Sequence, residues 1–232
     1  MLQISLERNE KPSYRINEAF KQLRTNIIFS GSDIKVICLT SSIPNEGKSN
    51  VSFNLALSFA ESNKKVLFID ADLRRSVLLG RYIPDHAVLG LTHYLSGING
   101  LDEILYESNI SNLDIIFTGP VPPNPAELLG SKVFTNLINQ LREEYDFIII
   151  DTPPLGSVID SVIIAENCDG VVFVIEADAI SYRYAQRVKS QLEKSKCKIL
   201  GAVLNKVSVD KKQYPYYMKK YEKMGNKYYT EY

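Results

Sequence analysis

The sequence has few cysteines and histidines, and their spacing argues against several common sites. Cys38, Cys168 and Cys197 are odd in number and widely separated, which is typical of a reducing compartment and not of a disulfide framework. His86 and His93 have no cysteine or second histidine at metal-ligand spacing, so we do not expect a zinc site. The chain also has no G-x-S-x-G turn to present a serine nucleophile.

The sequence likewise lacks net charge and any long apolar run. Lysine plus arginine and aspartate plus glutamate both number 27, so the whole chain has no field that would draw it to nucleic acid or lipid. No apolar run approaches the roughly 18 residues that cross a bilayer. Charged residues throughout the first thirty positions leave no room for a secretory signal core. We therefore expect a cytoplasmic protein that binds no nucleic acid.

What the sequence does have is an alternation of apolar strands and helical patterns. The apolar runs are typical of strands buried on both faces of a sheet, and they cover residues 35–40, 65–70, 113–119, 146–151, 170–176 and 199–205. Helical spacing lies between several of them, at 50–63, 124–145 and 181–195. This alternation predicts an α/β fold, a parallel sheet covered by helices on both faces, over residues 31–209.

A phosphate-binding loop is predicted directly after the first of these strands. The segment SSIPNEGKSN follows a strand and precedes a helix, and it matches G-x-x-x-x-G-K-[ST] with Ser42 in place of the first glycine. Gly47 lets the backbone aim N–H groups at phosphate oxygens, Lys48 can reach the β and γ phosphates, and the Ser49 hydroxyl can bind Mg²⁺. A polar turn that merely caps the helix is the simpler alternative. The candidate ATP-binding residues are Ser42, Pro44, Asn45, Glu46, Gly47, Lys48, Ser49 and Asn50.

Three aspartates follow two of the other predicted strands. Asp70 and Asp72 end the segment VLFIDAD, and Asp151 ends YDFIIID. Each one alone is typical of a turn. Because ligands bind at the carboxyl ends of strands in open α/β sheets, three such carboxylates beside a phosphate loop predict ligands for Mg²⁺ and an acceptor for a proton.

Taken together, the segments PNEGKS, DADLR, IIIDTPP and GPVPPNPAELLGS and a tyrosine-rich C-terminus resemble the bacterial protein-tyrosine kinases of capsule and exopolysaccharide synthesis. The resemblance runs from about residue 18 to residue 232, and it is to the Gram-positive form in which the cytoplasmic kinase is a separate chain. It implies a P-loop fold and a non-receptor kinase that transfers the γ-phosphoryl group of ATP to tyrosine. It also implies a protein recruited to the inner face of the plasma membrane by a membrane-spanning activator.

The same resemblance implies roles for individual residues. Lys48 would contact the phosphates, Ser49 and Asp151 would bind Mg²⁺, and Asp70 and Asp72 would serve Mg²⁺ and the incoming tyrosine hydroxyl. Asp70 is the favoured proton acceptor. Asn205, which ends ILGAVLN, matches a position from which the wider group contacts adenine, although a lone asparagine there is more often a turn residue.

The two ends of the chain are expected to serve assembly and self-modification. The N-terminal segment, residues 1–30, has helical spacing over 14–30, and the family closes rings of subunits through an acidic residue and two arginines at the positions of Glu18, Lys21 and Arg24. Lysine at the middle position cannot make the planar two-pronged contact of arginine, so the interface is expected to be weaker or differently arranged. A solvated charged face is the alternative.

The C-terminal segment, residues 210–232, holds half of the fourteen tyrosines and is expected to be disordered, because Pro215, Gly225 and Asn226 interrupt every periodicity. Its lysines give it a local excess of positive charge, so stacking on single-stranded nucleic acid or binding to an acidic membrane is the less favoured alternative. We expect it to be phosphorylated by neighbouring subunits, and the expected acceptors are Tyr214, Tyr216, Tyr217, Tyr221, Tyr228, Tyr229 and Tyr232.

The alternative function for this loop chemistry is that of a P-loop ATPase that acts by nucleotide-dependent assembly. ATPases of septum placement and plasmid partition have a related phosphate loop, with a lysine after its first position that crosses a dimer to the partner's nucleotide. This chain has Ile43 there, and that group does not usually end in a tyrosine cluster. Kinase chemistry is therefore favoured, with a homo-oligomer, the activator, a cognate tyrosine phosphatase and proteins of polysaccharide synthesis as the expected partners.

Overall fold

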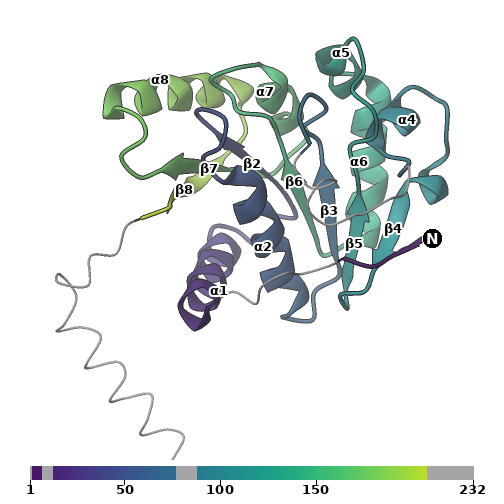
Figure 1. The fold of residues 1–232 in the computed structure, drawn as a ribbon, viewed down its shortest axis with the longest axis horizontal. Helices are drawn as coiled ribbons and strands as arrows, with labels where there is room; N and C mark the ends of the chain where they lie inside the picture. Colours follow the sequence, from purple (N-terminus) through teal and green to yellow (C-terminus); the bar gives the residue numbers. More distant parts are fainter. Residues whose placement is uncertain (1, 7–12, 77–87, 208–232) are drawn as a thin grey trace, which may run out of the picture.

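The computed structural model describes residues 2–6, 13–76 and 88–207, which form an eight-stranded sheet with helices on both faces (Figure 1). The C-terminal segment with its seven tyrosines lies outside the described residues, as does His86. The strands are β1 (Leu2–Ile4), β2 (Val36–Ser41), β3 (Val66–Asp70), β4 (Leu105–Ser108), β5 (Leu113–Ile116), β6 (Phe147–Asp151), β7 (Gly170–Glu176) and β8 (Ile199–Asn205).

The predicted fold class is confirmed, with one addition to the sheet. The strand order is β1-β4-β5-β3-β6-β2-β7-β8, and the six predicted strands all run parallel. Strand β4 runs antiparallel to β5, and β1 runs parallel to β4, so the sheet is mixed at that edge. Sequence analysis did not predict β1 or β4, because both are short and partly exposed and lack the apolar runs of buried strands. The division at residues 30 and 209 stays a prediction.

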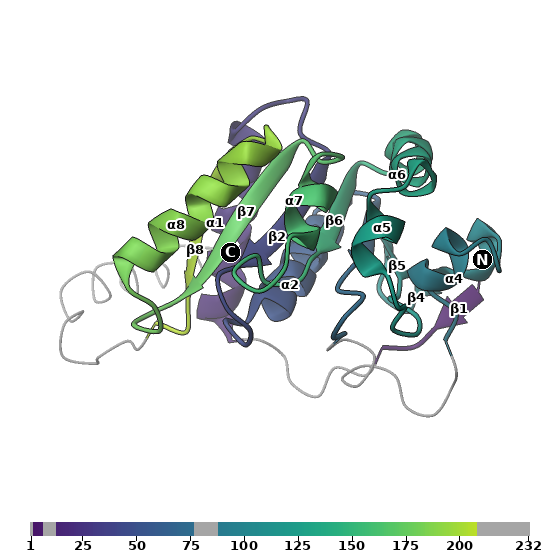
Figure 2. The same ribbon diagram turned by 90° about the horizontal axis from the view of Figure 1, so that it is seen from above.

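Helices α1 and α2 cover one face of the sheet, and the later helices cover the other (Figure 2). Alternate side chains of β2 show this division, since Ile37 and Leu39 pack with α1 and α2 whereas Val36 and Cys38 pack with α4 to α8. The helices are α1 (Tyr14–Phe29), α2 (Lys48–Ala60), α4 (Leu91–Leu95), α5 (Pro125–Leu129), α6 (Lys132–Glu144), α7 (Asp160–Ala165) and α8 (Tyr182–Leu192), with 3₁₀ turns at Leu101–Glu103 and Glu193–Ser195.

The helical pattern predicted over 124–145 forms two helices instead of one. The first begins with Pro125, whose fixed φ suits an initial helical position. It ends at Leu129, and α6 begins after Ser131, whose hydroxyl accepts a hydrogen bond from the Phe134 N–H at 3.3 Å. No helix in the described part of the chain combines the length and apolar character needed to cross a membrane.

Strand order brings the predicted site residues to one edge of the sheet. Strands β3 and β6 are neighbours, and Asp70 and Asp151 are partners in their register. Strand β2 lies on the other side of β6 and runs directly into the predicted phosphate loop after Ser41. The carboxyl ends of β2, β3 and β6 therefore meet where ligands bind in open α/β sheets.

Candidate active site

The predicted phosphate loop connects β2 to the start of α2, and its backbone makes a tight turn there. Asn45 and Gly47 both have positive φ, 69° and 84°. A Cβ atom added to Gly47 would lie 2.2 Å from Asn205 Nδ2, so both the backbone conformation and the available space require glycine. Because α2 begins at Lys48, the loop presents the N-terminus of a 13-residue helix, which favours phosphate.

The end of β8 holds this loop from the side. Asn205 Nδ2 donates to the backbone oxygen of Glu46 at 2.8 Å, and Lys206 Nζ donates to the backbone oxygen of Asn45 at 2.7 Å. Lys206 also pairs with Glu176 Oε2 at 2.8 Å. The structure therefore brings Asn205 to the loop, and its contact with adenine stays a prediction.

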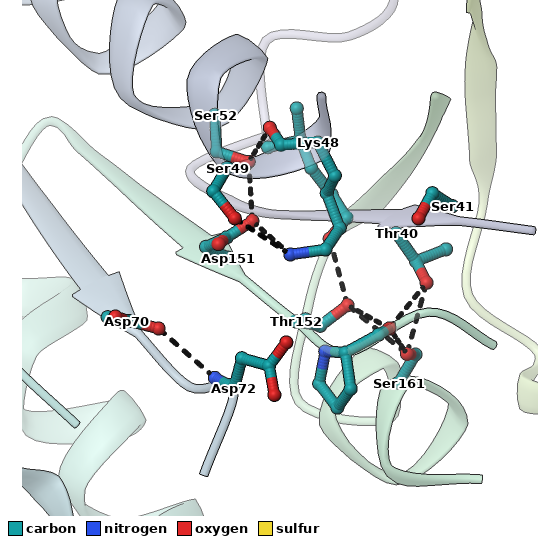
Figure 3. A network of polar contacts seen from close by, with 12 residues as sticks. Thr40, Ser41, Lys48, Ser49, Ser52, Asp70, Asp72, Asp151, Thr152 and Ser161 are labelled. Atoms are coloured by element: carbon teal, nitrogen blue, oxygen red, sulfur yellow. Dashed lines mark hydrogen bonds and ion pairs between the residues drawn. The ribbon is translucent and has the colours of Figure 1, made fainter. Parts of the chain in front are cut away.

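Lys48 lies against Asp151 at the centre of the site (Figure 3). Lys48 Nζ is 2.7 Å from Asp151 Oδ1, and both side chains are buried, with 6% and 2% exposed. The Ser52 hydroxyl donates to the same carboxylate oxygen at 2.8 Å, and Lys48 Nζ lies 3.3 Å from Ser49 Oγ. Ser52 was not among the predicted residues, although it lies one helical turn after Lys48, and its Oγ is also 2.9 Å from the Lys48 backbone oxygen.

Asp70 and Asp72 have different environments. Asp70 is buried behind the cavity, where its carboxylate accepts the Ser76 hydroxyl at 2.6 Å and the Asp72 N–H at 3.2 Å. Burial, together with the charge of Asp151, raises the pKa of Asp70 to about 7. Asp72 lines the cavity, and its carboxylate accepts the backbone N–H of Arg75 at 3.0 Å. Burial also raises the pKa of Asp72.

These groups surround one cavity of about 380 Å³ at the edge of the sheet. The loop and the start of α2 form one side, Asp72 and the two arginines after it form another, and the segment after β6 forms a third. Among the predicted residues, those that line it are Pro44, Asn45, Gly47, Lys48, Ser49, Asn50 and Asp72. Ser42, Glu46, Asp70 and Asp151 are buried and do not line the cavity, and Asn205 is partly exposed and does not line it either. The Ser42 hydroxyl is buried and has no hydrogen-bond partner within the described residues.

The donor set suits the predicted magnesium ion. The hydroxyl of Ser49 and the carboxylates of Asp72 and Asp151 are oxygen ligands, which Mg²⁺ prefers. Within residues 2–6, 13–76 and 88–207, no three His, Cys, Asp or Glu side chains form a ready-made metal cage. Mg²⁺ needs none, because it binds through one or two protein groups together with substrate phosphates and water.

Two further groups shape the cavity, and neither was among the predicted residues. Arg74 lines the cavity, and its Nε and Nη2 donate to the two carboxylate oxygens of the fully buried Asp160 at 2.7 and 3.0 Å. Ser161 and Thr40 both donate to the backbone oxygen of Pro153, which fixes the turn after β6 (Figure 3). The first two residues of α7 thus position two walls of the cavity.

The predicted assembly residues lie on α1, where they make contacts within their own chain. Lys21 Nζ is 2.8 Å from Glu18 Oε1, and both side chains are about half exposed. Arg24 instead reaches α2, where its Nη1 donates to the backbone oxygen of Ser58 and lies 3.4 Å from the Ser58 hydroxyl oxygen. Their role between subunits stays a prediction.

The chain is similar to tyrosine kinases in both sequence and structure. Residues 34–200 match the family described as AAA domain. Over 194 residues the chain is 45% identical to "Tyrosine-protein kinase CpsD" of Streptococcus agalactiae serotype Ia, and the match covers 84% of each chain. The crystal structure of the chimerical protein CapA2B2 is similar with a TM-score of 0.82 and 30% identity, over 90% of this chain and 95% of that one. The kinase domain of Escherichia coli tyrosine kinase ETK is similar with a TM-score of 0.75 and 31% identity, over 84% and 78% of the two chains.

The alternative reading as a septum-placement ATPase is weaker. The septum site-determining protein MinD of Pyrococcus horikoshii, complexed with Mg-ADP, is similar with a TM-score of 0.63 and 26% identity, over 76% of this chain and 72% of that one. Both groups share the sheet and the phosphate loop, but the kinases match more of the chain at higher identity. The chain therefore belongs to the AAA-domain family and, within it, to the bacterial tyrosine-protein kinases.

Proposed function

We propose that this kinase transfers the γ-phosphoryl group of ATP to tyrosines in the C-terminal segment of a neighbouring subunit, and that it thereby regulates capsular or exopolysaccharide synthesis. The cavity carries this proposal, because it places a lysine, a helix N-terminus and a carboxylate around one space. Such a site neutralises the charge of a polyphosphate and positions an acceptor, which is what phosphoryl transfer requires.

The chain's own groups divide the work as follows. Loop N–H groups and Lys48 hold the phosphates, and Lys48 leaves Asp151 for the phosphate oxygens. The tyrosine oxygen forms a bond to the γ phosphorus while the bond from phosphorus to the β–γ bridging oxygen breaks, and ADP leaves with that electron pair. Mg²⁺ would supply further charge neutralisation, held by Ser49 and Asp151.

The phenolic proton needs an acceptor, and we assign it to Asp72. Its carboxylate lines the cavity, whereas Asp70, the residue favoured from the sequence, lies behind it. In Figure 3 the Asp72 carboxylate points toward the same space as the Lys48 amine. D72N is expected to lower kcat by at least about 100-fold, the usual contribution of a general base, and more than D70N does. If D70N lowers kcat as much as D72N or more, Asp70 would be the proton acceptor instead.

The charge of the C-terminal segment suggests how its phosphorylation affects the assembly of subunits. Its lysines make the unmodified segment basic, and each phosphate adds about −1.5 to −2 charges at neutral pH. A basic segment is attracted to a neighbour's acidic, ATP-loaded cavity, and a phosphorylated one is repelled. Phosphorylation would therefore loosen a ring held by Glu18, Lys21 and Arg24, and a cognate phosphatase would restore it. A membrane-spanning activator would bring the assembly to the inner face of the membrane.

A mixing experiment tests transfer between subunits. A chain ending at Lys212 keeps the proposed active site but lacks the seven C-terminal tyrosines, whereas full-length K48M keeps those tyrosines but lacks the phosphate-binding lysine. Incubated together with Mg²⁺ and ATP, the pair is expected to yield phosphotyrosine in C-terminal peptides of K48M, detected by mass spectrometry. K48M alone is the control. Absence of phosphate from the mixture, with a modified wild-type chain, would contradict transfer between subunits.

A further inference from the structure

Glu46 is a buried carboxylate inside the phosphate loop, and it faces away from the cavity. Its neighbours Asn45 and Gly47 both line the cavity, but Glu46 does not, and only 1% of its surface is exposed. Within the described residues it takes part in no ion pair. A loop that binds anions thus contains an acidic side chain without a cationic partner, which calls for a physical reason.

Backbone N–H groups take the place of a cation. Glu46 Oε2 accepts the N–H of Ser42 at 2.6 Å and of Ile43 at 2.8 Å, and Oε1 accepts the N–H of Glu176 at 3.2 Å. Ser42 and Ile43 begin the loop, and Glu176 ends the neighbouring strand β7. The carboxylate therefore connects the loop to its own start and to the end of β7, and it satisfies three backbone N–H groups, among them that of the buried Ser42.

The backbone oxygens of the same turn are also held by hydrogen bonds. The backbone oxygen of Glu46 accepts from Asn205, and that of Asn45 accepts from Lys206. Asn205 and Lys206 hold the carbonyls, and the Glu46 carboxylate holds the start of the loop. Gly47 and the first residues of α2 line the cavity, and the first N–H groups of a helix have no partner within it. Groups of the chain itself therefore hold the loop in its turn.

We propose that Glu46 is a positioning residue that preorganises the phosphate loop for nucleotide without touching the nucleotide itself. The free energy of nucleotide binding then does not include the cost of ordering the loop, so the affinity for nucleotide is higher. Because this interaction is the same in the ground state and the transition state, its loss raises the KM for ATP and leaves kcat unchanged. This inference rests on the proposed function only in that it requires the cavity to bind ATP.

The test compares E46Q with a matched control, D169N, in the full-length chain. Glutamine keeps the size of Glu46, but its NH₂ group must face at least one N–H group, donor against donor. Asp169 is the counterpart at the other end of β2, where its carboxylate accepts the N–H groups of Lys35 at 2.9 Å and Val36 at 2.7 Å, and it does not line the cavity. Both substitutions remove a carboxylate that holds two successive backbone N–H groups beside β2.

Titration calorimetry with Mg·ADP and steady-state kinetics with ATP supply the readouts. E46Q is expected to raise the Kd for ADP and the KM for ATP by at least about tenfold, with kcat within about twofold of wild type. D169N is expected to lower the melting temperature while leaving Kd, KM and kcat within about twofold. If E46Q does not fold, E46D, which keeps the charge but is one methylene shorter, takes its place with the same expectation.

Several results would overturn the proposal. These are an unchanged Kd in the glutamine variant, a rise no larger than that in D169N, a loss of kcat at constant KM, or failure of both Glu46 variants to fold. A wild-type chain that binds no ADP would instead refute the proposed function. If the wild-type chain binds ADP and E46Q binds it with the same Kd, the role of Glu46 is refuted but the proposed function is not.

Discussion

Asp70 and Asp151 are partners in the parallel register of β3 and β6, and both residues are buried at the end of their strands. Lys48 contacts Asp151 at 2.7 Å, whereas Asp70 has the Ser76 hydroxyl and a backbone N–H as its partners. Two like charges thus lie near one lysine in a buried site. The arrangement is unfavourable for the nucleotide-free protein and useful for binding cations.

The first prediction concerns stability and pH in D70N. Because the folded pKa of Asp70 is about 7 and its ordinary value is 3.8, the folded protein binds the proton more tightly than the unfolded chain does. The free energy of unfolding therefore falls as pH rises from about 4 to 7. D70N removes this term and is expected to stabilise the nucleotide-free protein by about 1–4 kcal/mol above that range. Urea unfolding across pH checks it, and a D70N chain less stable than wild type at about pH 8 would contradict it.

The second prediction concerns the buried pair of Lys48 and Asp151. K48M is expected to abolish transfer and to lower the free energy of unfolding by about 3–5 kcal/mol, because it leaves a buried carboxylate without its cation. The double variant K48M/D151N should recover most of that stability and none of the activity. Thermal unfolding of the three chains provides the measurement. Equal stability of K48M and wild type would show that the carboxylate is neutral or hydrated when alone.

The third prediction concerns the two-pronged contact between Arg74 and Asp160. Lysine cannot span both carboxylate oxygens, so R74K is expected to lower kcat about tenfold or more while leaving the Kd for ADP unchanged. The matched control is R142K, because Arg142 pairs with Asp169 at a place that does not line the cavity. It should affect stability only. A kcat loss of the same size in R142K would show that R74K acts through the fold.

The fourth prediction concerns the C-terminal segment. A chain ending at Lys212 is expected to bind ADP like the full chain and to lose most of its self-modification, measured as total phosphotyrosine after incubation with Mg²⁺ and ATP. Light scattering should show a smaller mass for a fully phosphorylated full-length preparation than for an unphosphorylated one. Retained phosphotyrosine in the truncated chain would contradict the assignment of the tail, and equal masses would contradict the link to assembly.

Sequence alone predicted the parts of the site that depend on neighbours along the chain. The buried strands are apolar runs, the loop carries a glycine at a position with φ of 84°, and Asp70 and Asp151 end strands, so local chemistry sufficed for each. Strand β4 was not predicted because LYES is short and half polar. Its place in the sheet comes from its pairing with β5.

The directions of side chains, and the pairing of residues far apart in the chain, could not be predicted from the sequence. Arg74 and Asp160 are 86 positions apart, and no pattern links a residue after β3 to the first residue of α7. The loop motif placed Glu46 among nucleotide-binding residues, but a motif does not say that its side chain turns inward to Ser42 and Ile43. Nor could strand-end position rank Asp72 above Asp70, since the difference lies in which carboxylate reaches the cavity.

Because Lys48 forms an ion pair with Asp151, a nucleotide phosphate that binds Lys48 must replace the Asp151 carboxylate as its partner. A ligand gains the lysine only by displacing a carboxylate that is already desolvated and in contact with it, so it must offer more negative charge at that point than Asp151 does. The lysine of a P-loop reaches the β and γ phosphates, which a diphosphate or triphosphate carries and a monophosphate lacks. We therefore expect the protein to bind ADP at concentrations where it does not bind AMP, and we attribute this selectivity to the pairing of Lys48 with Asp151.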